Sequence, residues 1–242
     1  MNLFSEISMR PLQLFDPESS SYTYIVVAQG SNEAIIIDPV DRHYERDLLQ
    51  LERLNLRLMY ILETHVHADH ITSASRLRQM TGAKIAVAGL CRFEGADLQL
   101  QEFGVIRFGD TDQITALCTP GHTAGSMSFL WHDNVFTGDS LMINGCGRTD
   151  FQGGSAKTLY ESVVEKLFAL PDNTLVWPGH DYNGHYVSSI AWEKKNNRRL
   201  AGRQKDDFID LMANLQLAPP RMLDVAVSAN RKLGIHNSFE SQ

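Results

Sequence analysis

Three histidines and one aspartate fall within six residues of the 242-residue chain, in the segment His65-Val66-His67-Ala68-Asp69-His70. Neutral imidazole and carboxylate are common protein ligands of zinc and iron. The segment directly follows residues 57–64, an apolar stretch typical of a buried strand, and a loop at a strand end can aim alternate side chains at one point. This cluster predicts a metal site, although a lone histidine would more often only cap the following helix.

Three later segments each place a further ligand-type residue after a β-prone stretch. They are Gly121-His122, Gly138-Asp139 and Gly179-His180. The glycine before each of these residues permits a sharp turn and a close approach of the backbone. Each pair alone is common by chance, but the four segments in this order strongly indicate one metal centre.

The elements that must position these residues alternate between strands and helices. Residues 22–29 and 33–38 predict a hairpin of short strands, rich in Val, Ile and Tyr. Predicted helices cover residues 42–55, 71–80, 155–169 and most of the chain from 186 onward; predicted strands cover 57–64, 83–88, 105–108, 114–118, 127–131 and 175–177. This order suits sheets covered by helices, and two stacked sheets with outer helices are one such arrangement.

Composition excludes several classes of protein. Hydrophobic residues make up 43% and charged residues 21% of the chain, as in a folded globular protein, and we expect one domain over residues 1–242. The formal charge of −7 argues against nucleic-acid and anionic-membrane partners, and no apolar run reaches the roughly 20 residues of a membrane span. Residues 1–6 lack a leader pattern, and the three cysteines form no C-x-x-C pair, so we expect a cytoplasmic protein.

The ligand-type residues together resemble the metallo-β-lactamase superfamily, whose hallmark is H-x-H-x-D-H followed by a later His, an Asp and a final His. The matching residues are His65, His67, Asp69, His70, His122, Asp139 and His180. The resemblance implies a fold of the α/β (α+β) class, an αββα sandwich with the metal at one edge, followed by C-terminal helices specific to a branch of the superfamily.

Within the superfamily, residues 145–152, Gly-Cys-Gly-Arg-Thr-Asp-Phe-Gln, resemble the signature of persulfide dioxygenases. His180-Asp181-Tyr182 and Asn197-Arg198-Arg199-Leu200 are also similar to later motifs of that family. Glyoxalase II enzymes share the Gly-Cys-Gly-Arg element, so the Thr-Asp-Phe-Gln continuation is the more specific part. The resemblance implies oxidation of glutathione persulfide, with O2 and water, to sulfite and glutathione.

The same resemblance implies one Fe(II) per chain, bound by His65, His122 and Asp139. Such a two-histidine, one-carboxylate site leaves coordination positions open for a sulfur substrate and dioxygen. The remaining residues of the constellation would then orient the ligands or mark a vestigial second metal site; they are His67, Asp69, His70, His180 and Cys146.

Glutathione carries two carboxylates, so an acidic protein must hold it with local positive charge. Six basic residues and no acidic residue lie between positions 194 and 205. Such a run is ordinarily a solvated helix face. The family resemblance nevertheless assigns Arg199, together with Tyr182 and Arg148, to positions associated with glutathione binding.

Two other functions stay open from the sequence. A glyoxalase II-like thioester hydrolase (hydroxyacylglutathione hydrolase) would bind two metals, with Asp139 bridging them and a metal-bound hydroxide as nucleophile. A non-catalytic sensor of persulfide or metal would keep the site and signal through a partner. Related enzymes also suggest a homodimer.

Overall fold

The computed structural model describes residues 10–91, 93–220 and 222–235 of the chain. Residues 1–6, on which the prediction about a leader depends, lie outside these ranges. Within the described ranges, every helix is too short or too polar to span a lipid bilayer.

The first sheet has six strands in sequence order, β1-β2-β3-β4-β5-β6. They are β1 (Leu12–Asp16), β2 (Ser21–Val27), β3 (Glu33–Ile37), β4 (Arg57–Glu63), β5 (Lys84–Ala88) and β6 (Leu98–Leu100). Strands β2 and β3 form the predicted hairpin, and the pairs from β3 to β6 are parallel. The carboxyl ends of β3 and β4 therefore meet at one edge of the sheet, where Asp38 and the histidine segment follow them.

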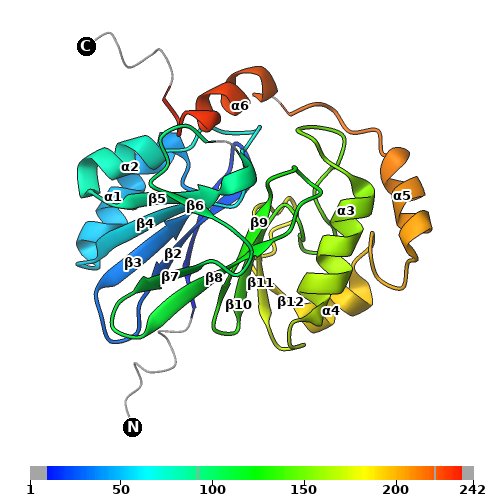
Figure 1. The fold of residues 1–242 in the computed structure, drawn as a ribbon, viewed down its shortest axis with the longest axis horizontal. Coiled ribbons are helices and arrows are strands. Elements are labelled where there is room, and N and C mark those ends of the chain that lie inside the picture. Colours follow the sequence, from blue (N-terminus) through cyan, green and yellow to red (C-terminus); the bar gives the residue numbers. More distant parts are fainter. Residues whose placement is uncertain (1–9, 92, 221, 236–242) are drawn as a thin grey trace. The chain divides into compact units, whose positions relative to one another are not determined.

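Helices and short helical turns accompany this sheet. They are η2 (Asp41–His43), α1 (Tyr44–Arg53), α2 (Ala74–Thr81), η3 (Gly89–Cys91) and α6 (Leu223–Arg231). Of these, α1 and α2 agree with the helices predicted over residues 42–55 and 71–80. Helices α1 and α2 lie together beside β4 and β5 (Figure 1). Leu51 and Leu77 are buried, and α2 ends at Gly82, which has the left-handed conformation expected of a C-cap.

The second sheet has the strand order β12-β11-β10-β9-β8-β7. Its strands are β7 (Val105–Phe108), β8 (Asp112–Cys118), β9 (Met127–Trp131), β10 (Asn134–Gly138), β11 (Leu175–Pro178) and β12 (Ser188–Ser189). Strands β10 and β11 are parallel neighbours. Their carboxyl ends therefore bring Asp139 and His180 to the same edge, and His122 lies in the loop between β8 and β9.

Five helical segments follow or interrupt the second sheet: α3 (Ala156–Glu161), the π-helical η4 (Ser162–Lys166), η5 (Leu167–Ala169), α4 (Ile190–Asn196) and α5 (Lys205–Ala213). Ser155 caps α3 as predicted, because its Oγ accepts a hydrogen bond from the backbone N–H of Thr158. Helices α3 and α5 lie side by side (Figure 1), and Leu159 and Phe208 are completely buried.

Contacts divide the chain into two compact units. The first comprises Met1–Leu100, Val105–Gln113 and Pro219–Gln242, and the second Gln101–Gly104 and Ile114–Ala218. The predicted α/β class with two sheets is confirmed. That residues 1–242 form one domain stays a prediction.

Candidate metal centre

Asp38 holds the beginning of the histidine segment. Its Oδ1 accepts a hydrogen bond from the backbone N–H of Thr64 at 2.7 Å, and its Oδ2 accepts one from Thr64 Oγ1 at 2.7 Å. Thr64 Oγ1 also lies 2.9 Å from Nδ1 of His65. Because the only hydrogen of this hydroxyl is donated to Asp38, Thr64 Oγ1 must accept from His65 Nδ1–H. This fixes the tautomer of His65 and leaves the ring lone pair on Nε2.

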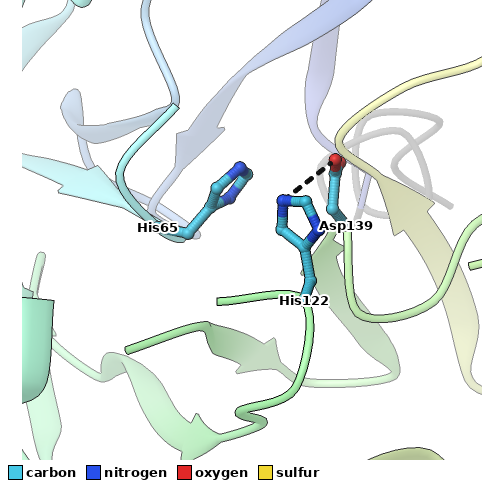
Figure 2. A group of neighbouring side chains, drawn as sticks. All are labelled: His65, His122 and Asp139. Carbon is cyan, nitrogen blue, oxygen red and sulfur yellow. Dashed lines mark ion pairs between the residues drawn. The ribbon is translucent and has the colours of Figure 1, made fainter. Parts of the chain in front are cut away.

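A backbone carbonyl fixes His122 in the same way. Nδ1 of His122 lies 2.7 Å from the carbonyl oxygen of Arg148, which can only accept, so Nδ1 carries the proton. The lone pair of this ring is therefore also on Nε2. That atom lies 3.5 Å from Oδ2 of Asp139 (Figure 2).

Asp139 completes the set with a carboxylate oxygen that needs a positive partner. Its Oδ1 is buried and accepts no hydrogen bond from the described residues, which is costly for a carboxylate without a nearby cation or donor. Nε2 of His180 lies 3.6 Å from this oxygen. The His180 ring is buried and stacks on Tyr182, with centroids 5.9 Å apart.

His65, His122 and Asp139 offer candidate ligand atoms that all lie within 4.8 Å of one another. Figure 2 shows these three side chains, drawn from the loops that follow β4, β8 and β10. Two imidazoles with Nε2 lone pairs and one carboxylate with an unsatisfied oxygen fit a divalent transition metal. The three residues that the family resemblance singled out are therefore a candidate metal centre.

A second group, His67, Asp69 and His70, also offers ligand atoms within 4.8 Å of one another. Oδ2 of Asp69 accepts a hydrogen bond from Ser21 Oγ at 2.9 Å and lies 2.8 Å from His70 Nδ1. The structure therefore brings together three of the five residues assigned to a vestigial second site, and Asp69 also has hydrogen-bond partners within the protein.

His67 has two carboxylate neighbours that sequence reasoning missed. Its Nε2 lies 3.2 Å from Asp38 Oδ1 and 3.3 Å from Glu63 Oε2, and all three side chains are buried. Burial alone would lower the pKa of His67, but the two carboxylates outweigh it and raise that pKa well above its usual value. The only sequence signal for Glu63 was a charged residue at the end of an apolar strand.

Two glycines let the backbone approach the ligands closely. A Cβ atom at Gly147 would lie 2.6 Å from the carbonyl oxygen of Asp139 and 2.7 Å from Nδ1 of His122. A Cβ atom at Gly179 would lie 2.6 Å from Oδ1 of Asp139. No side chain fits at either position, which is the close approach expected for the glycine before His180.

All three guanidinium nitrogens of Arg148 donate hydrogen bonds within the protein. Nε and Nη2 each donate to a different oxygen of Asp150 at 2.6 Å, and Nη1 donates to the carbonyl of Ala218 at 2.6 Å. A cavity of about 330 Å³ lies beside Arg148 and Thr149, with Met212 of α5 among its other lining residues. Contact between Arg148 and glutathione stays a prediction that would require exchange of these bonds.

Arg199 keeps part of its guanidinium available. Nη1 donates to the carbonyl of Cys146 at 2.5 Å, while Nε and Nη2 donate to no acceptor within the described part of the chain. The Cys146 thiol is buried, and burial raises its pKa to about 11. A thiol with this pKa stays protonated near neutral pH, so Cys146 is suited to packing and not to nucleophilic attack.

Comparisons with known proteins agree with this geometry. The family model of the metallo-beta-lactamase superfamily matches residues 16–180. The chain is 44% identical over 225 residues to the mitochondrial persulfide dioxygenase ETHE1 of Mus musculus, covering 92% of this chain and 88% of the relative. A crystal structure of ETHE1 from Myxococcus xanthus has a TM-score of 0.91 and 46% identity, covering 94% of this chain and 100% of that one.

A hydrolase is similar over a shorter part of the chain. The hydroxyacylglutathione hydrolase of Cereibacter sphaeroides is 39% identical, covering 79% of this chain and 81% of the relative. The similarity to the dioxygenases is therefore both closer and more extensive than the similarity to this hydrolase.

Proposed function

Because the chain belongs to the metallo-β-lactamase superfamily and, within it, to the persulfide dioxygenases, we propose that it oxidises glutathione persulfide with O2 and water to sulfite and glutathione. The predicted fold and family are confirmed by these similarities. The observation that carries the proposal is the ligand set: two imidazoles of fixed tautomer and a carboxylate with a buried, unsatisfied oxygen.

We propose that His65, His122 and Asp139 bind one Fe(II). Iron in such a site supplies redox chemistry and open coordination positions. Thr64 and the Arg148 carbonyl keep the Nδ1 protons of the two imidazoles engaged, so each ring would bind the metal through Nε2. His180, 3.6 Å from Oδ1 of Asp139, would restrain the carboxylate.

The substrate contacts are also a proposal. Nε and Nη2 of Arg199 are suited to a glutathione carboxylate, because an arginine edge matches two carboxylate oxygens. Tyr182 is 69% exposed beside His180 and can offer its ring or hydroxyl to the same ligand. The cavity beside Arg148 and Thr149 would accommodate part of the tripeptide.

We propose a cytoplasmic homodimer without nucleic-acid or membrane partners. The charge of −7 and the three free cysteines support this environment. The Mus musculus relative is named as mitochondrial, so the location of this chain needs its own test by fractionation and immunoblotting. Sedimentation analysis would test the dimer.

The deciding experiment compares two activities of protein purified without oxygen. We expect one iron per chain, O2 uptake with glutathione persulfide, sulfite formed in equal amount, and no hydrolysis of a hydroxyacylglutathione. The variant D139N serves as control and should lose both iron and O2 uptake. Two zinc ions per chain with thioester hydrolysis would establish the hydrolase instead, and persulfide binding without turnover would establish the sensor.

A further inference from the structure

The five residues from Met142 to Cys146 form a tight loop between two parts of the metal centre. The backbone N–H of Met142 donates to the carbonyl of Gly145 at 3.0 Å, and that of Gly145 donates to the carbonyl of Met142 at 3.2 Å. Asn144 has φ of 58°, a left-handed conformation that asparagine tolerates better than most residues. Asp139 precedes this loop and Gly147 follows it, so its position affects both.

Two buried side chains from the end of α4 hold the loop by its backbone. Oε2 of Glu193 accepts from the backbone N–H of Asn144 at 2.9 Å. Nδ2 of Asn197 donates to the carbonyl of Gly145 at 2.9 Å and to Glu193 Oε2 at 2.7 Å. Glu193 and Asn197 are four residues apart, the spacing that places two side chains on one face of a helix end.

The side chains of Glu193 and Asn197 are buried, and their other polar atoms also form hydrogen bonds within the protein. Glu193 is 0% and Asn197 2% exposed. The second carboxylate oxygen of Glu193 accepts from Ser188 Oγ, and Oδ1 of Asn197 accepts from the backbone N–H groups of Arg199 and Leu200. A buried carboxylate costs free energy unless hydrogen bonds compensate it, so Glu193 is an expensive residue to keep for packing alone.

The residues that follow the loop form hydrogen bonds with two of the proposed metal ligands, Asp139 and His122. The backbone N–H of Gly147 donates to the carbonyl of Asp139 at 2.7 Å. The next residue, Arg148, supplies the carbonyl that holds the His122 Nδ1 proton. A shift of the loop would therefore move the backbone of Asp139 and the acceptor of His122 together.

We infer that Glu193 and Asn197 are positioning residues that hold the loop Met142–Cys146, and through it Asp139 and His122, in the arrangement that binds the metal. The inference deepens the proposed function and rests on it only in treating Asp139 and His122 as ligands. This role of Glu193 and Asn197 is separate from the proposed contact of the neighbouring Arg199 with substrate.

The test measures Co(II) affinity of the metal-free full chain from its visible absorption, which needs no turnover. E193A and N197A should weaken the dissociation constant by about 10- to 100-fold, the usual cost of removing a group that orients a ligand. E193Q should lose less, since its amide oxygen can still accept from Asn144. K195A, at an exposed position of the same helix, is the matched control.

A second readout is the His122 Nδ1–H resonance in the NMR spectrum of each folded variant. We expect it to be lost or shifted in E193A and N197A and unchanged in K195A. Lower thermal stability with unchanged Co(II) affinity and unchanged resonance in E193A and N197A would overturn the inference. If these two do not fold, the same result in N197D, which keeps Oδ1 as an acceptor but lacks the Nδ2 donor to Gly145, overturns it. Wild-type protein that binds no Co(II) instead refutes the proposed metal site itself.

Discussion

One hydrogen-bond acceptor sets the tautomer of each of the two proposed ligand histidines, His65 and His122. Thr64 Oγ1 and the carbonyl of Arg148 each take the Nδ1 proton of one ring, and neither belongs to the H-x-H-x-D-H motif. Asp38 in turn fixes the direction of the Thr64 hydroxyl. The proposed ligands His65 and His122 are therefore held in one tautomer by groups that carry no metal-ligand signature themselves.

Replacing Thr64 by valine should weaken metal binding. T64V removes the acceptor for His65 Nδ1–H, so the ring can rotate or change tautomer, and we expect about a 10-fold higher dissociation constant for Co(II). T64S keeps the hydroxyl and should restore most of the affinity. Equal affinities of wild type, T64V and T64S, measured by absorption titration, would show that Thr64 does not act on the metal.

Replacing Arg199 by alanine should impair substrate binding more than metal retention. R199A removes the available guanidinium edge, and loss of a charge-assisted hydrogen bond of about 1.5–3 kcal/mol corresponds to a KM at least 10-fold higher. R198A, at the adjacent exposed position, is the control and should change KM little. Oxygen-electrode kinetics and iron analysis provide both readouts, and an unchanged KM in R199A would remove it from the substrate site.

At the scale of elements, the ends of parallel strands collect the polar groups. Strands β3 and β4 bring Asp38 to Thr64, and β10 and β11 bring Asp139 to His180. The connecting loops must then pass very close to the ligands. Glycine is required at Gly147 by this crowding, while Gly145, two residues earlier, has open space where a Cβ would lie.

These two glycines provide a matched pair of substitutions. G147A should abolish metal binding or folding, because its Cβ would clash with the Asp139 carbonyl and the His122 ring. G145A should leave both intact. Metal content and circular dichroism of the two purified variants test this, and normal metal content in G147A would contradict the packing described for the loop.

Helix α1 carries a buried charge that should make stability depend on pH. Asp47 is fully buried, Oδ2 accepts no hydrogen bond from the described residues, and burial raises its pKa to about 6 against the attraction of Arg46. The folded state therefore binds this proton more tightly than the unfolded state, so the stabilising effect of the proton is lost as pH rises from about 4 to about 6.

The variant D47N should not lose stability in this way as the pH rises. Two pKa units correspond to roughly 3 kcal/mol, so the free energy of unfolding of wild type should fall relative to D47N by up to this amount between pH 4 and 7. Urea unfolding at several pH values measures the difference. E52Q, at an exposed position of α1, should follow wild type, and parallel curves for wild type and D47N would show that Asp47 has no raised pKa.

The sequence predicted most elements because their cues are local. The β2–β3 hairpin, α2 with its Gly82 cap, and the Ser155 start of α3 were all foreseen from short-range patterns. Strands β1, β6 and β12 were not predicted. Strands β1 and β6 are defined by pairing with a neighbour, and the two-residue β12 lies where the sequence predicted helix. No local sequence pattern predicted that the helix continues as a π-helix after Glu161.

The site was foreseen in its ligand types but not in its supporting atoms. His65, His122 and Asp139 were named through the family resemblance, and that they bind a metal stays a prediction. Glu63 and Asp38 could not, because their role depends on side-chain directions that only the folded chain sets. For Glu193 and Asn197 the spacing of four residues was visible, but the backbone they hold lies some fifty residues earlier in the chain.

We propose that one iron per chain is sufficient for turnover by this protein. The second group, His67, Asp69 and His70, contains enough ligand atoms for another metal, so its presence does not decide the number bound. His67 also forms a further candidate group with the buried carboxylates of Asp38 and Glu63, so these neighbours do not decide the number either. The number is therefore best measured through activity.

The most direct measurement is a titration of the metal-free protein with Fe(II) under anaerobic conditions, followed by assay of O2 uptake with glutathione persulfide at each step. We expect activity to rise linearly and to reach its plateau at one Fe(II) per chain, with one sulfite formed for each O2 consumed. A plateau reached only at two metals per chain, or full activity with zinc alone, would contradict this expectation.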